Sequence, residues 1–233
     1  MRIEPHQVHV WHATFLPKQP SQIDETQILD DTEMARAHRF RFEIHKNRYL
    51  HAHVLLRKIL SCYLDCDAKS IRFINDIHGK PMIASPKSSL QFNLSHSENE
   101  FICALHSHQP VGIDIEIIKP NIELTLAQRY FTDTEYQALL HCDDNEKASA
   151  FCFLWTAKEA IIKATGLALI TSLKQFSINL NQKTQLVAFN NTTWLLTELK
   201  NSNDFKTTLA CDKSVTEIVH CGFDHDVPLI KKT

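Results

Sequence analysis

Glycine is scarce in this sequence, which limits how the chain can bind phosphate. Among 233 residues there are four glycines, Gly79, Gly112, Gly166 and Gly222, and no two of them lie near each other. A Walker loop or a dinucleotide-binding fingerprint needs two or three glycines clustered within several residues. The glycine positions therefore exclude both of these nucleotide-binding classes. A phosphate bound by this chain would have to be held by side chains.

Long apolar runs and an excess of one charge are also missing. No run approaches the roughly 20 residues that span a bilayer, and the N-terminal segment has no apolar signal core, so we expect a cytoplasmic protein with no membrane partner. The 25 Lys+Arg against 27 Asp+Glu argue against a protein that binds nucleic acid along a basic face. The seven cysteines form no CxxC pair, which favours reduced, mostly buried thiols over a zinc site.

Apolar periodicity predicts an α+β protein built from two similar halves. Residues 106–110 are short, polar and end in Pro110. We place the junction there, between an N-terminal half of residues 1–110 and a C-terminal half of residues 111–233. The expected helices cover residues 32–38, 43–64, 123–130, 133–141 and 146–165, and the expected antiparallel strands cover residues 7–15, 71–74, 81–83, 90–94, 101–106, 111–118, 176–180, 193–199, 205–211 and 215–223.

A pair of carboxylates stands in the predicted strand Val111-Gly112-Ile113-Asp114-Ile115-Glu116-Ile117. Because strand side chains alternate between faces, Asp114 and Glu116 share one face and the isoleucines pack on the core. Taken alone, this pair is more often the polar face of a solvated strand. The alternative is a site for a hard cation such as Mg²⁺, which prefers carboxylate oxygens and leaves coordination positions open to substrate phosphates.

A second candidate lies in the predicted helix of residues 146–165. Trp155, Glu159 and Lys163 are spaced by four residues and share one helix face. A surface Glu–Lys pair is the simplest explanation of this spacing. However, the flanking residues are apolar on nearly all sides, so the pair is expected at a cleft or interface, where charges cost free energy unless something pairs with them. A metal ion and a phosphate would do so.

Two weaker signals lie in the N-terminal half. Phe92-Asn93-Leu94-Ser95-His96-Ser97 ends a predicted strand with groups that could donate to phosphate, although they could equally cap a turn. The basic residues upstream are explained mostly by a solvated helix face. Since the overall charge is balanced, they also form a local cluster that suits a small polyanionic ligand. These residues are Arg36, Arg39, Arg41, Lys46, Arg48, Arg57, Arg72 and Lys80.

Together these segments resemble a known family. Asn93–Ser97, Gly112–Glu116 and Trp155–Lys163 look like the three signature motifs of the 4′-phosphopantetheinyl transferases. Arg39-Phe40, Arg48, Arg57 and Gly79-Lys80-Pro81 resemble the Sfp-type branch, in which one chain forms a pseudodimer. The resemblance implies two α/β halves with small three-stranded antiparallel sheets, packed as a pseudodimer in a monomeric protein, with the active site in the cleft between them.

The resemblance also implies an activity and its partners. Members of the family transfer the 4′-phosphopantetheine arm of coenzyme A to a serine of an apo acyl or peptidyl carrier protein, with Mg²⁺, and release adenosine 3′,5′-bisphosphate. Asp114, Glu116 and Glu159 would be the metal ligands. Glu159, directly or through a water, would take the serine proton, and Lys163, Asp114 and His96 complete the expected catalytic set. The residues expected to bind coenzyme A are Arg36, Arg48, Arg72, Lys80, Ser95, His96, Lys158 and Lys163.

Two other functions fit parts of the pattern. A non-catalytic module that binds coenzyme A or a carrier protein would keep the same fold, but the intact Asp114, Glu116, Glu159 and Lys163 argue against it. A different Mg²⁺-dependent phosphoryl-transfer or hydrolytic enzyme would use the same carboxylates. The absence of a glycine loop weighs against nucleotide kinases within that class.

Overall fold

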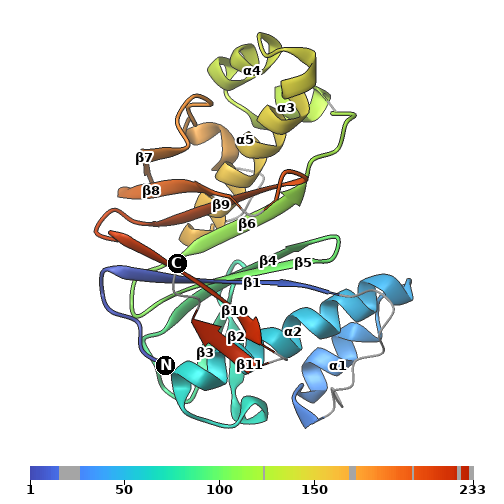
Figure 1. Ribbon diagram of the computed structural model, residues 1–233, viewed down its shortest axis with the longest axis vertical. Coiled ribbons are helices and arrows are strands. Elements are labelled where there is room, and N and C mark those ends of the chain that lie inside the picture. The colour runs from blue at the N-terminus through green and yellow to red at the C-terminus, as the bar shows by residue number, and fades with distance from the viewer. Residues whose placement is uncertain (16–26, 123, 168–171, 201, 225–226, 231–233) are drawn as a thin grey trace.

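The structure, a computed structural model, describes residues 1–15, 27–122, 124–167, 172–200, 202–224 and 227–230. Two sheets lie at the centre, and a long helix covers the outer face of each (Figure 1). The expected α+β class is therefore confirmed. No helix within the described residues combines the length and the apolar character needed to cross a membrane.

The N-terminal half is built around a mixed sheet with the strand order β11-β10-β1-β5-β4. The long helix α2 packs on this sheet, and a separate two-stranded hairpin, β2–β3, lies beside it. The bounds are β1 Gln7–Thr14, α1 Asp31–Ala37, α2 Glu43–Leu64, η2 Ala68–Ser70, β2 Arg72–Asn75, β3 Pro81–Ser85, β4 Gln91–Ser97, β5 Glu100–His106, β10 Glu217–Asp224 and β11 Val227–Ile230.

The C-terminal half contains an antiparallel sheet with the strand order β6-β9-β8-β7, covered by helix α5. Two short helices, α3 and α4, lie at the far end of α5 in Figure 1. The bounds are β6 Gly112–Ile117, α3 Leu124–Tyr130, α4 Asp133–Leu140, α5 Asp144–Thr165, η3 Leu173–Gln175, β7 Thr184–Phe189, β8 Thr192–Leu199 and β9 Phe205–Asp212. Glu123, the expected first residue of the helix that becomes α3, lies outside the described residues.

The two halves are joined by an apolar core between their sheets. Val8, Val10 and Ile102 of the N-terminal sheet pack in one buried cluster with Ile113 and Ile115 of β6. Separate cores lie between each sheet and its helix, against α2 in one half and against α5 in the other. Four layers result, α2, sheet, sheet and α5, and β4 and β6 lie side by side where the two halves meet.

Three expectations about the strands need correction. Among the described residues the main sheets have five and four strands rather than three each. Strand β10, expected in an antiparallel sheet of the C-terminal half, pairs in parallel with β1. Strands β10 and β11 therefore belong to the sheet of the N-terminal half. The apolar side chain of Val219 packs in the core beneath α2, which places β10 in that sheet.

The segment 176–180, within the described range 172–200, is not a strand, although its side chains alternate between buried and exposed. Its backbone bonds to side chains: the Ile178 N–H donates to Glu135 Oε1 at 2.7 Å, and the Asn179 N–H donates to Gln185 Oε1 at 2.9 Å. The strand in this region is β7, which the sequence pattern does not indicate because its buried positions begin with a glutamine, Gln185.

Candidate active site

The site begins where β6 and α5 approach each other, and a glycine permits that approach. A Cβ atom on Gly112 would lie 2.0 Å from the Ala160 carbonyl oxygen and 2.4 Å from the Ala164 nitrogen. Both neighbours are backbone atoms, so only a residue without a side chain fits here. Two residues further along β6, Asp114 faces the last turn of α5.

Asp114 is the meeting point of the three sequence motifs. Its side chain is buried, and its Oδ1 accepts hydrogen bonds from Ser95 Oγ at 2.8 Å and from Lys163 Nζ at 2.6 Å. Lys163 Nζ also donates to Ser95 Oγ at 3.1 Å. Ser95 comes from β4, Asp114 from β6 and Lys163 from α5. The N-terminal and C-terminal halves of the chain therefore both supply polar groups to this cluster.

Glu116 and Glu159 lie close enough to Asp114 to feel its charge. Burial, and after it the negative charge of Asp114, raise the pKa of Glu159 to about 7, although Lys163 opposes the shift. Burial and Asp114 likewise raise the pKa of Glu116, although Ser97 Oγ donates to Glu116 Oε2 at 2.9 Å and opposes the shift. Three acidic groups thus share a partly desolvated region, where a positive charge would be favourable.

Whether this region suits a metal ion depends on its free oxygens. The Oδ2 atom of Asp114 is buried and meets no hydrogen-bond donor in the described part of the chain. A buried carboxylate oxygen without a donor costs free energy, and a cation would satisfy it. Within the described ranges no three His, Cys, Asp or Glu side chains are gathered tightly enough to hold a metal, and Lys163 supplies the positive charge at Asp114. The donor chemistry fits Mg²⁺, but the ligands are not drawn together around a common point.

Basic side chains of β4 and α2 lie near one another beside this cluster. His96 follows Ser95 on β4; its ring is exposed at the surface, yet partial desolvation and then the charges of Lys163, His53 and Arg48 lower its pKa. Arg48 donates to Glu98 Oε2 at 2.6 Å, and its buried Nε has no acceptor among the described residues. His53 was not predicted, although it lies one helical turn beyond Tyr49 and their rings are 4.1 Å apart.

Arg36, another expected ligand of coenzyme A, lies on α1. Its guanidinium stands 5.5 Å from the centre of the Tyr49 ring, and it lines an open cavity of about 830 Å³ with Arg39 and Asn75. Arg72 is exposed on β2 and donates to the Lys69 carbonyl at 2.9 Å. The assignment of both arginines to coenzyme A stays a prediction.

Lys158 does not reach the site, which corrects its expected role. Its side chain is 1% exposed, and its ammonium donates to the carbonyls of Leu173 at 2.6 Å and Phe176 at 2.8 Å. The third partner is Glu135, at 3.0 Å. Because the ammonium is buried and fully engaged, Lys158 is a structural residue of the core between α5 and α4 rather than a ligand of coenzyme A.

Lys80 is also directed away from the carboxylates. Its Nζ donates to the backbone carbonyls of Lys163 at 2.6 Å, Ala164 at 3.2 Å and Val111 at 3.4 Å. These atoms belong to the end of α5 and to the residue before β6. An ammonium that donates to three carbonyls has no N–H group left for a phosphate. The expected phosphate contact of Lys80 is therefore corrected as well.

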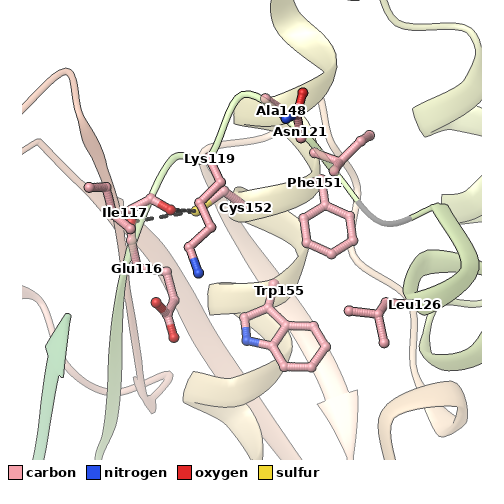
Figure 2. A pocket seen from close by; sticks show the side chains of 10 residues that line it. Glu116, Ile117, Lys119, Asn121, Leu126, Ala148, Phe151, Cys152 and Trp155 are labelled. Atoms are coloured by element: carbon pink, nitrogen blue, oxygen red, sulfur yellow. Dashed lines mark hydrogen bonds between the residues drawn. The ribbon is translucent and has the colours of Figure 1, made fainter. Parts of the chain in front are cut away.

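A cavity of about 220 Å³ opens beside Glu116, between β6 and α5 (Figure 2). The rings of Phe151 and Trp155 are stacked on its α5 side, with centroids 6.4 Å apart and planes at 12°. Of the residues that line this cavity, Glu116 and Trp155 were predicted from the sequence and the others were not, although the four-residue spacing of Phe151 and Trp155 was an available signal. The lining comprises Glu116, Ile117, Lys119, Asn121, Ile122, Leu126, Ala148, Phe151, Cys152 and Trp155.

Comparison with known proteins shows the family to which this chain belongs. The model of the 4′-phosphopantetheinyl transferase superfamily matches residues 110–210, and the model of the 4′-phosphopantetheinyl transferase N-terminal domain matches residues 13–108. The chain is similar to the 4′-phosphopantetheinyl transferase HetI of a Nostoc species, with 35% identity over 196 residues, which are 83% of this chain and 82% of that protein. It is also similar to the 4′-phosphopantetheinyl transferase Sfp of Bacillus subtilis, with 40% identity over 151 residues, which are 65% of this chain and 66% of that protein.

A solved structure, the holo-acyl-carrier-protein synthase AcpS of Thermotoga maritima, aligns with a TM-score of 0.30 and 18% identity over 45% of this chain and 63% of that one, a likeness that carries no weight by itself. The family models cover both halves of the chain, and HetI matches most of it. The resemblance expected from the three motifs is confirmed: the chain belongs to the 4′-phosphopantetheinyl transferase family of enzymes.

Proposed function

We propose that this enzyme transfers the 4′-phosphopantetheine arm of coenzyme A to a serine of an apo acyl or peptidyl carrier protein, with Mg²⁺, and releases adenosine 3′,5′-bisphosphate. The serine Oγ forms a bond to the phosphorus that carries the pantetheine arm. The bond from that phosphorus to the bridging oxygen of the pyrophosphate breaks, and the bridging oxygen leaves with the adenosine bisphosphate. The observation that carries this proposal is the contact of Ser95, Asp114 and Lys163, which joins the three motifs at one point.

Asp114, Glu116 and Glu159 would hold the Mg²⁺ ion, and the unpartnered Oδ2 of Asp114 is the atom that best supports this assignment. When bound, such an ion offsets the negative charge that develops on pyrophosphate oxygens during phosphoryl transfer. The carboxylates come from β6 and α5, which the close approach at Gly112 holds together. Their relative position therefore depends on the fold rather than on a flexible loop.

The chain's own basic groups bind and orient the phosphates. The Lys163 ammonium lies 2.6 Å from Asp114 Oδ1, where it can donate to the bridging oxygen that leaves with the adenosine bisphosphate. The lowered pKa of His96 favours the neutral imidazole, which can still donate from one ring nitrogen. Arg48 and Arg36 extend the positive region along α2 and α1, toward the adenosine end of coenzyme A. Glu159, half-buried one turn before Lys163, takes the serine proton directly or through a water.

The pantetheine arm fits the cavity that begins at Glu116. Its lining combines the aromatic rings of Phe151 and Trp155 with the polar ends of Lys119 and Asn121, which suits an aliphatic chain that contains amide groups. Because Glu116 stands at the boundary between this cavity and the carboxylate cluster, an arm bound there would leave its phosphate next to Asp114. We also propose a monomer, since one chain supplies Ser95 from one half and Asp114 from the other.

One experiment tests the proposed activity against a non-catalytic binding module. The protein is incubated with coenzyme A, Mg²⁺ and an apo carrier protein, and the carrier is examined by mass spectrometry for the added phosphopantetheine on its serine. Transfer is expected with the wild-type protein and is expected to be lost in Glu159→Gln, with coenzyme A binding retained in both. Tight binding of coenzyme A without modification of any carrier in a panel would support the binding module instead.

A further inference from the structure

Lys80 and its hairpin contact both elements that carry the catalytic groups. The turn Asp76–Gly79 joins β2 and β3, and Asp76 holds it by accepting from the backbone N–H groups of His78 and Lys80, both at 2.8 Å. From the end of this turn the Lys80 side chain runs to the last turn of α5. The hairpin belongs to the N-terminal half, so this contact crosses between the halves.

The carbonyls that Lys80 contacts would otherwise have no partner within the helix. The last four carbonyls of an α-helix lack an N–H group further along the helix. At the end of α5 the Gly166 N–H donates to the Ile162 carbonyl at 3.0 Å. The next two carbonyls, of Lys163 and Ala164, accept from the Lys80 ammonium instead. A cation at this position also interacts favourably with the negative end of the helix dipole.

The same ammonium reaches the Val111 carbonyl, at 3.4 Å, immediately before β6. The hairpin tip also packs closely on the end of α5, because a Cβ atom on Gly166 would lie 2.9 Å from Asp76 Oδ2 and 3.7 Å from Lys80 Cδ. The start of the strand that carries Asp114 and the end of the helix that carries Lys163 are therefore joined through one side chain.

We propose that Lys80 is a positioning residue, whose ammonium fixes the end of α5 against the start of β6 and so holds Lys163 in place over Asp114 during transfer. This inference rests on the proposed function. We expect Lys80 to affect the rate of transfer rather than the affinity for coenzyme A, because its ammonium donates to backbone carbonyls. Burial of the ammonium lowers the pKa of Lys80 to about 8, against the charge of Asp76, which agrees with a group withdrawn from water.

The test separates the rate of transfer from binding. Lys80→Met removes all three donors, Lys80→Arg restores a charged donor, and Lys87→Met removes an exposed charge shortly after the same hairpin. For each variant we would measure kcat for a carrier protein, the Kd of coenzyme A by calorimetry, Tm, and hydrogen exchange of the amides of residues 159–166. For Lys80→Met we expect kcat to fall roughly tenfold or more with Kd within about twofold, faster exchange in the last turn of α5, and partial recovery of kcat in Lys80→Arg.

Lys87→Met should match the wild type in all four measurements. A Kd for coenzyme A raised about tenfold at unchanged kcat would make Lys80 a phosphate ligand and overturn the inference. A lower Tm with unchanged kcat and Kd would leave it a purely structural residue. If Lys80→Met does not fold, Lys80→Gln, which keeps an amide donor, must show the same fall in kcat with a nearly unchanged Kd for coenzyme A. The absence of transfer by the wild-type protein would instead refute the proposed function, whatever the variants do.

Discussion

The ammonium of Lys163 lies 2.6 Å from Oδ1 of Asp114, so that the last turn of α5 and the middle of β6 share one ion pair. Ser95 of β4 donates to the same carboxylate oxygen. Three short motifs that are far apart in the sequence thus meet at a single atom. This arrangement makes the stability of the site and its activity depend on the same contacts.

Removing the cation of this pair should cost stability as well as activity. Lys163→Met leaves the buried Asp114 carboxylate without its charged partner, and we expect a loss on the order of 2 kcal/mol in the free energy of unfolding. The loss is smaller than for a fully buried pair, because 27% of the Lys163 side chain is exposed. Urea unfolding of Lys163→Met, Asp114→Asn and the double variant measures the coupling. Additive losses would contradict an interaction between the two side chains.

Lys158→Met should be more damaging to the fold. It leaves the buried Glu135 carboxylate without its charged partner, and breaking such a pair costs about 3–5 kcal/mol. The double variant Lys158→Met with Glu135→Gln should recover part of this loss. Well below Tm, the Kd for coenzyme A should be unchanged in the single variant. A weaker affinity for coenzyme A in a variant of wild-type stability would show that the sequence-based assignment of Lys158 was right after all.

The close approach of β6 and α5 predicts that Gly112 cannot be replaced by alanine. The added Cβ would meet backbone atoms of Ala160 and Ala164, so the strand must move away from the helix. We expect a loss of more than about 2 kcal/mol in unfolding free energy and a large fall in transfer. Gly79→Ala is the matched control: its Cβ meets no described atom within 4 Å, and its φ of +91° alone should cost about 1 kcal/mol.

The cavity beside Glu116 predicts that a substitution in its lining changes the affinity for coenzyme A but not the affinity for adenosine 3′,5′-bisphosphate. Trp155→Ala removes one of the stacked rings that line it, so the Kd for coenzyme A should rise about tenfold, or about 1.4 kcal/mol. Adenosine 3′,5′-bisphosphate, which lacks the pantetheine arm, should bind the variant and the wild type equally. Leu186→Ala, an exposed position on β7, controls for the loss of an apolar surface side chain. Equal weakening for both ligands would place the arm elsewhere.

The lowered pKa of Lys80 predicts a pH dependence of stability with a definite sign. Burial lowers this pKa from 10.5 to about 8, and Asp76 opposes the shift. Between these two values the unfolded chain binds more protons than the folded one, so this group makes the unfolding free energy rise with pH. The stability of the wild type relative to Lys80→Met should therefore increase from about pH 8 to pH 10.5 and stay constant below about pH 8. Urea unfolding across this range is the measurement, and a constant difference would contradict it.

The sequence predicted the site's centre because its motifs follow simple periodicities. Alternation along β6 placed Asp114 and Glu116 on one face, and the four-residue spacing on α5 placed Lys163 beyond Glu159. Helix α2 has the bounds expected from its apolar stripe. The expected coenzyme A ligand Lys158 failed for a geometric reason. Adjacent residues on a helix point about 100° apart, so a neighbour of Glu159 in the sequence faces another side.

Other features depended on long-range contacts that no local pattern contains. Lys80 was expected to bind phosphate. Its long side chain instead reaches the end of α5, where its ammonium donates to the Lys163 carbonyl. The segment 176–180 alternates like a strand, yet side chains from α4 and β7 occupy its backbone N–H groups. The parallel pairing of β10 with β1 joins residues about 210 apart, and only the folded chain decides it.

That pairing has a consequence for the order in which the protein can fold during synthesis. Strand β1 lies between β5 and β10, so its second edge stays open until residues 217–224 have left the ribosome. Until then the N-terminal sheet exposes unpaired backbone groups of a strand that carries the fully buried Trp11 and Val8. The sheet of the N-terminal half therefore cannot be completed as a separate nascent unit before residues 217–224 emerge.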